Sequence, residues 1–197
     1  STLARSSAAS DVYKRQIPVG NRSDLRSFYD RMVGTDDAAA AGNNGLIVNT
    51  NGGVDDKWTA SQVGDLTYCV SDDFGADKSK IVSTMQQGAA LWEGASSAID
   101  FVYDSSQDGS CTTSNSNVVF SVEPTDSGGQ YIARAFFPIS SKGERNVLVD
   151  DSIWSSGTWT PGNILGHELG HTLGFRHEHT RPESGTCFED NNWRPLT

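Results

Sequence analysis

Hydrophobic residues recur at helical spacing in three segments of the chain. The first covers residues 23–33, with Ser23 as the predicted N-cap. The second covers residues 78–99, where the apolar residues form one stripe along a long helix. The third covers residues 162–175, which follow Pro161 at a favourable helix start. We therefore predict three amphipathic helices.

Short apolar runs separated by Gly/Ser turns predict five strands. They cover residues 66–70, 101–103, 118–122, 131–137 and 146–150. Downstream of the first helix, the order is strand, helix, four strands, helix, which is typical of a mixed α/β (α+β) domain. We expect one sheet that lies between the two helices of this part.

The chain upstream of these strands has a different character. Residues 36–53 are rich in Ala, Asn and Gly, and the compact part is expected to begin near Asp65. The first 16 residues show no periodicity and carry a positive charge, which favours a non-native or disordered leader. We therefore divide the chain into a leader (1–16), a pro-region or linker (17–64) and a compact domain (65–197).

The composition excludes several classes of function. The 197 residues include 25 acidic and 15 basic side chains, which gives a formal charge of −10 at pH 7. Without a Lys/Arg cluster the chain cannot displace counterions from phosphates, so nucleic acid is excluded as a partner. No run approaches the roughly 18 apolar residues that a membrane span requires. The composition leaves the oligomeric state open.

Three cysteines are spaced too widely for a CxxC motif, namely Cys69, Cys111 and Cys187. Cys69 ends a predicted strand and Cys111 lies in a polar loop, so we pair these two as the disulfide of an exported protein. Cys187 then needs a partner beyond residue 197. The alternative is a cytosolic protein with three buried free thiols.

All four histidines lie between residues 167 and 179. His167 and His171 are four residues apart, so on a helix they share one face at a separation of about 6 Å. Two imidazoles at that separation can bind one Zn²⁺. Glu168 is rotated off this face and can act as the general base that takes a proton from water.

Gly174 and His177 extend the pair to the string HExxHxxGxxH. Gly174 can adopt the positive φ that ends the helix and turns the chain toward His177, the predicted third ligand. Three protein ligands leave one coordination position for water, which is typical of one catalytic zinc ion. The alternative is a His-rich surface helix without metal. His179 has no assigned role.

This string resembles the signature of the metzincin zinc endopeptidases. Residues 175–183 (FRHEHTRPE) are similar to the astacin branch of that group. Residues 128–138 (GGQYIARAFFP) resemble the matrixin strand that borders the substrate cleft, and residues 150–154 (DDSIW) resemble the acidic segment before the matrixin zinc helix. The resemblance implies a metzincin-like mixed sheet with a long helix and a zinc helix, and protein or peptide substrates.

Two features depart from the matrixin pattern. Arg134 and Val147 stand where matrixins have histidines for a structural zinc, which argues against a second ion. Matrixin latency uses a pro-region cysteine, but no cysteine precedes Cys69. A pro-region aspartate, as in astacins, is the alternative, and the upstream candidates are Asp36, Asp37, Asp55, Asp56 and Asp65.

Metzincins also have a Met-containing turn downstream of the third histidine, near which astacins place a tyrosine. Here Met32 and Met85 both precede His177, and the last tyrosine is Tyr131. We therefore expect a fragment of a secreted metalloendopeptidase whose C-terminal subdomain, with the lower wall of the cleft, is missing.

The predicted function is zinc-dependent hydrolysis of peptide bonds, with Glu168 as the general base. The alternatives are a non-catalytic zinc-binding or adhesion module on the same fold, and an inactive fragment of the protease. The presence of Glu168 favours the enzyme, because catalytically dead relatives can lose this residue and keep the ligands. A purely structural metal is disfavoured, because three ligands leave its coordination shell unclosed.

Overall fold

The computed structural model of the chain describes residues 46–157, 159–177 and 193–195. The predicted helix at 23–33 lies outside the described residues, as do the leader 1–16, His179 and Cys187.

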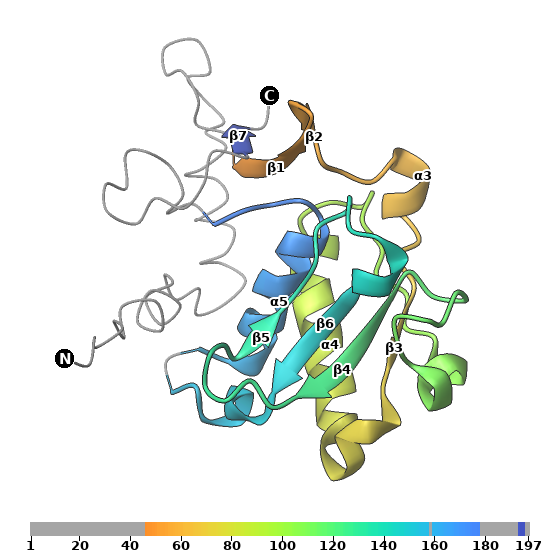
Figure 1. Cartoon of the computed structure of the whole chain (residues 1–197), viewed down its shortest axis with the longest axis vertical. Coiled ribbons are helices and arrows are strands. Elements are labelled where there is room, and N and C mark those ends of the chain that lie inside the picture. The colour runs from red at the N-terminus through yellow and green to blue at the C-terminus, as the bar shows by residue number, and fades with distance from the viewer. Residues whose placement is uncertain (1–45, 158, 178–192, 196–197) are drawn as a thin grey trace, which may run out of the picture.

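A four-stranded mixed sheet forms the centre of the described structure, in the order β3-β4-β6-β5 (Figure 1). The strands are β3 (Tyr68–Val70), β4 (Phe120–Thr125), β5 (Ala133–Arg134) and β6 (Asn146–Asp150). Strands β3, β4 and β6 are parallel, and Val122 of β4 lies opposite both Val70 and Val147. Strand β5 runs antiparallel to β6 and is an edge strand of this sheet.

Both long helices, α4 (Lys78–Glu93) and α5 (Pro161–Thr172), lie on one face of this sheet (Figure 1). The two helices are in direct contact. A Cβ added to Gly88 of α4 would lie only 2.7 Å from the backbone nitrogen of Gly166 in α5. One continuous core fills the space between the helices and the sheet. The predicted mixed α/β (α+β) class, with a mixed sheet and two long helices, is confirmed. The expected placement of the sheet between the two helices is wrong, because both helices cover the same face. Helical periodicity identifies a buried stripe but not the sheet face that the stripe covers.

Several predicted elements are shorter in the structure. Helix α4 ends at Glu93, with Gly94 as its C-cap, and does not reach Ile99. The predicted strand 101–103 runs beside β3 through backbone hydrogen bonds to Leu66 and Tyr68, but forms only an isolated bridge. The strand predicted at 131–137 is limited to β5. Four 3₁₀ helices complete these connections: η1 (Asp72–Asp77), η2 (Ser105–Ser110), η3 (Lys142–Glu144) and η4 (Asp151–Ser155).

A second, small sheet has the order β2-β1-β7. Its strands are β1 (Ile47–Asn51), β2 (Val54–Asp55) and β7 (Trp193–Pro195), and the short helix α3 (Ala60–Val63) follows β2. Ile47 is fully buried and Val48 is 5 % exposed. Within the described residues, buried side chains therefore already occur in β1, upstream of Asp65. The assignment of residues 17–64 as a pro-region or linker stays a prediction.

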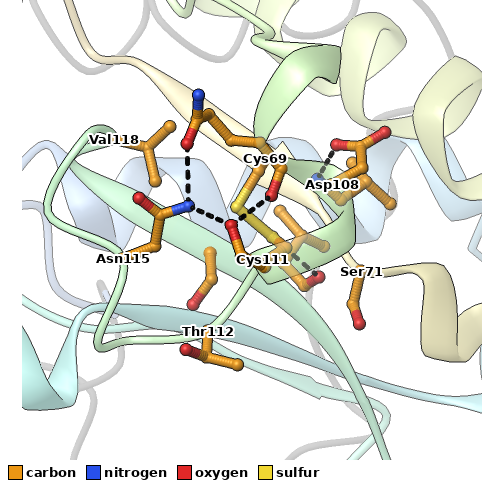
Figure 2. The surroundings of a disulfide bond; sticks show 12 residues. Cys69, Ser71, Asp108, Cys111, Thr112, Asn115 and Val118 are labelled. Atoms are coloured by element: carbon orange, nitrogen blue, oxygen red, sulfur yellow. Dashed lines mark hydrogen bonds between the residues drawn. A yellow bond between two sulfur atoms is a disulfide. The ribbon is translucent and has the colours of Figure 1, made fainter.

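The predicted disulfide is confirmed between Cys69 of β3 and Cys111, which follows η2 (Figure 2). The two Cα atoms lie 5.6 Å apart. Both cysteines are buried and form a small cluster with Val118, separate from the main core. The bond ties the outer parallel strand to the polar loop beside it.

Candidate metal centre

Helix α5 carries two of the predicted ligands, His167 and His171. The helix begins after Thr160, whose hydroxyl accepts a hydrogen bond from a first-turn backbone amide at 3.2 Å. Leu165 and Leu169 are fully buried against the core. The two histidines lie one turn apart on another side of the helix, where they are half-buried.

The end of α5 directs the chain toward His177. The Phe175 amide donates to the Gly170 carbonyl at 3.0 Å, and the Gly174 amide donates to the His171 carbonyl at 2.9 Å. This pair of bonds is the Schellman motif, which requires a left-handed residue after the helix. Gly174 has φ +103°, as the sequence predicted.

The three predicted ligands converge. The Nε2 atoms of His167, His171 and His177 lie 3.0–3.1 Å from one another. A ring nitrogen is either a donor or an acceptor, so a triangle of three leaves at least one pair of like groups facing each other. A shared cation removes this conflict, and tetrahedral zinc places its ligand atoms about 3.3 Å apart. The residues present therefore fit a metal ion, and they are the one such group among the described residues.

The second ring nitrogen of His171 orients this side chain. His171 Nδ1 lies 2.7 Å from the Phe175 carbonyl oxygen, which can only accept a hydrogen bond. Nδ1 therefore carries the proton, and in the neutral ring the lone pair lies on Nε2, at the centre of the triangle. A backbone carbonyl that fixes the tautomer of a histidine in this way is a usual partner of metal-binding imidazole.

Glu168 lies between the two helical histidines in sequence and is 8 % exposed. Burial raises the pKa of its carboxyl to about 8, while a hydrogen bond from the Ala135 backbone and the charge of Arg134 act in the opposite direction. The carboxylate therefore lies against the segment that contains β5, which the sequence predicted to border the substrate cleft.

The same segment also reaches the three converging histidines. The ring of Phe137 lies edge-on to the ring of His171, with the centroids 5.7 Å apart. The guanidinium of Arg176 lies 5.7 Å from the centroid of the same Phe137 ring. The segment after β5 thus forms one wall of the candidate site.

Two tryptophans support α5, and sequence reasoning did not assign them this role. Trp92 Nε1 donates to the Gly166 carbonyl at 2.6 Å, and its ring stacks on Phe175 at 5.2 Å. Trp58 Nε1 donates to the Thr172 carbonyl at 2.7 Å. The pattern placed Trp92 in a core stripe. The sequence could have indicated such a role, because a tryptophan in a buried stripe needs a hydrogen-bond acceptor for its indole N–H.

The fold and the histidine triad together define a metzincin-type metalloprotease. The profile of the family described as Matrixin matches residues 57–184, and the chain therefore belongs to the matrixin family of zinc-dependent proteases. A comparison with curated proteins returns no match. The astacin-like resemblance is not supported by this match, and residues 178–183, which carry most of it, lie outside the described residues.

The described structure also bears on membrane association. None of the helices within the described ranges is long and apolar enough to cross a bilayer.

Proposed function

We propose that this chain acts as a zinc-dependent endopeptidase that hydrolyses peptide bonds, with one zinc ion and Glu168 as the general base. The observation that carries this proposal is the convergence of three Nε2 atoms within 3.1 Å beside a buried carboxylate. Membership of the matrixin family supports it.

His167, His171 and His177 are the proposed ligands. When bound, zinc polarises the scissile carbonyl and lowers the pKa of a water molecule. The backbone carbonyl of Phe175 accepts the Nδ1 proton of His171, so the neutral ring presents its Nε2 lone pair to the metal.

Glu168 moves the proton in this proposal. Its carboxylate takes a proton from the water as the water oxygen attacks the carbonyl carbon. The same proton then passes to the amide nitrogen as the C–N bond breaks, so the proton balance is complete. The Ala135 amide that hydrogen-bonds Glu168 keeps the carboxylate beside β5.

The substrate is proposed to be an extended protein or peptide segment that pairs with the backbone around Ala133–Phe137. Strand β5 lies at the edge of the sheet, and edge strands accept a further strand through main-chain hydrogen bonds. We further propose that the protein is secreted, which the Cys69–Cys111 disulfide supports.

The variant Glu168→Gln tests the assignment of the general base. It should keep its zinc, because the side chain is not one of the three converging ligands, and it should lose 10²–10⁴-fold or more in peptide hydrolysis, roughly the contribution of general acid–base catalysis. Zinc content by elemental analysis and peptide cleavage are measured on the same preparation. Turnover at the wild-type rate by a zinc-loaded Glu168→Gln protein would exclude this role.

Two further variants test the ligand set. His177→Ala should lower the zinc content and abolish activity together, because it removes one of three ligands. His179→Ala should keep both, because the motif assigns it no role. Unchanged zinc in His177→Ala, or zinc loss in His179→Ala, would show that the ligand set is wrong.

A further inference from the structure

The β1–β2 hairpin pairs with residues 174–176, the segment that leads from α5 to His177 (Figure 1). The Asn49 amide donates to the first carbonyl of this segment at 2.8 Å, and the last amide of the segment donates to the Ile47 carbonyl at 2.9 Å. Val48 forms an antiparallel bridge with the residue between them. The residue directly before His177 is therefore held by β1.

A buried polar pair closes the hairpin behind this contact. Asn49 is 4 % exposed and Asp56 is 6 % exposed. The Asn49 side-chain amide donates to the Asp56 carboxylate at 2.8 Å, and the Asp56 backbone amide donates to the Asn49 carbonyl at 2.9 Å. Both bonds link β1, the strand that holds residues 174–176, to the residue that directly follows β2.

The hairpin and the segment are in close contact at one point. A Cβ added to Gly174 would clash with the Asp56 carbonyl oxygen, so a side chain at this position is excluded by the hairpin as well as by the positive φ. The backbone of residue 174 therefore lies directly against the residue that Asn49 holds in place.

The three ligands are fixed by different means. His167 and His171 belong to α5, whose backbone hydrogen bonds set their separation. His177 lies beyond the Schellman turn, in which the Phe175 amide donates to the Gly170 carbonyl of the helix. The hairpin supplies the backbone partner there, through the bond between Arg176 and Ile47.

We propose that the β1–β2 hairpin is a positioning element of the metal centre, in which Asn49 and Asp56 act as positioning residues for His177. This inference rests on the proposed ligand set of the preceding section. Groups that orient metal ligands typically change metal affinity by about 10–100-fold when they are removed, and we expect an effect of this size.

A matched control must separate an effect on the position of His177 from a general loss of stability caused by removing a buried aspartate. Asp108 is also a buried aspartate, 5 % exposed, and it accepts hydrogen bonds from the Val70 amide at 3.0 Å and from Lys78 at 2.7 Å. It lies near the Cys69–Cys111 disulfide (Figure 2) and bonds to β3, at the opposite edge of the sheet from β5. Loss of Asp108 should therefore reduce stability without reaching the three histidines.

The experiment uses the full chain and two readouts other than activity. The Kd for Zn²⁺ is measured by competition with a chromogenic chelator, and the visible spectrum of the Co²⁺-substituted protein reports the geometry of the ligands. The variants are Asn49→Ala, Asp56→Ala, Asp56→Asn, Asp108→Ala and His177→Ala. Asp56→Asn keeps an oxygen that accepts from Asn49, so it is the conservative replacement. Asn49→Ala serves as the test if Asp56→Ala fails to fold.

The expected result is a Kd about 10–100-fold higher and an altered Co²⁺ spectrum for Asn49→Ala and Asp56→Ala. Asp56→Asn should lie between the wild type and Asp56→Ala, because it keeps an acceptor for Asn49 but cannot also serve the Ile139 backbone as the carboxylate does. Asp108→Ala should bind zinc normally despite lower stability. Normal zinc binding by folded Asn49→Ala, or an equal loss in Asp108→Ala, would overturn the positioning role. Unchanged zinc affinity in His177→Ala would instead overturn the proposed ligand set.

Discussion

Asp150 shows how a single buried carboxylate ties two loops of the chain together. It ends β6 and is 5 % exposed. Its carboxylate accepts from the Ser152 amide at 3.0 Å, in η4, and from the Ser127 amide at 2.7 Å, in the loop before β5. Hydrogen bonds from Ser152 and Ser127 hold the pKa of Asp150 well below its usual range.

This pKa shift predicts a loss of stability in acid. A group with a lowered folded-state pKa stabilises the fold above its unfolded pKa, which for Asp is about 3.9. The contribution is therefore present at neutral pH and decreases as the pH falls below about 4. Asp150→Asn should cost about 1–3 kcal/mol at neutral pH, because its amide group cannot accept both bonds, and should flatten the acid limb of the stability curve.

Urea unfolding at several pH values checks this, with a chelator present so that zinc release at low pH does not contribute. Asp126→Asn is the matched control, since Asp126 is exposed and accepts a hydrogen bond from the Gly128 amide at 3.0 Å in the same loop. An acid limb as steep in Asp150→Asn as in the wild type would contradict the assignment.

At this scale the sequence predicted the convergence of the three histidines and the positive φ of Gly174. Both follow from spacing along one helix and one turn, which are local properties. The proposed roles of Asn49 and Asp56 could not be predicted, because the segment that they contact, residues 174–176, lies more than a hundred residues away in sequence. Periodicity contains no information on such pairs. The roles of His167, His171, His177 and Glu168 in catalysis stay predictions.

At the scale of elements, the contact between α4 and α5 explains the main error of the sequence analysis. Hydrophobic periodicity gives no weight to Gly88, because glycine contributes nothing to an apolar stripe. In the structure its missing side chain is what allows the two helices to approach, and this contact places both on one face of the sheet. Strand β6 was predicted with its observed bounds, because its apolar run is compact.

Gly88→Ala should therefore destabilise the fold, although alanine is the better helix former by about 1 kcal/mol. The new methyl group would lie 2.7 Å from the backbone nitrogen of Gly166, which cannot move aside as a flexible side chain can. Overpacking of this kind costs about 1–3 kcal/mol. Denaturant unfolding of the metal-free protein measures the difference.

Gly143→Ala is the matched control, because a Cβ at this position in η3 meets no atom within 4 Å. This variant should be neutral or slightly more stable than the wild type. If Gly88→Ala behaved like Gly143→Ala, the helices would not be in the close contact described.

At the scale of the whole molecule, residues far apart in sequence are brought together at two places. Strand β1 pairs with β7 and with the segment after α5, so a part of the chain that was assigned to a linker packs beside the candidate metal centre. The disulfide ties β3 to the loop after η2, beside the strand that lies farthest from β5 in the sheet. The number of cysteines and their sequence context predicted the disulfide. The pairing of β1 was not predicted, because residues 36–53 are rich in Ala, Asn and Gly and were interpreted as a linker.

Removal of the disulfide should therefore lower global stability without changing the metal site. Cys69 and Cys111 are 42 residues apart, and closing a loop of this length stabilises by about 4 kcal/mol in the chain-entropy model. The double variant Cys69→Ala/Cys111→Ala should lose about that much unfolding free energy when measured without metal, because bound zinc would add its own stabilisation. Its zinc affinity should equal that of the wild type, since neither cysteine is among the three converging ligands. Reduction of the wild type with dithiothreitol should give a similar loss and should not destabilise the double variant further. Loss of zinc affinity in a folded double variant would show that the far edge of the sheet and the histidine triad are coupled.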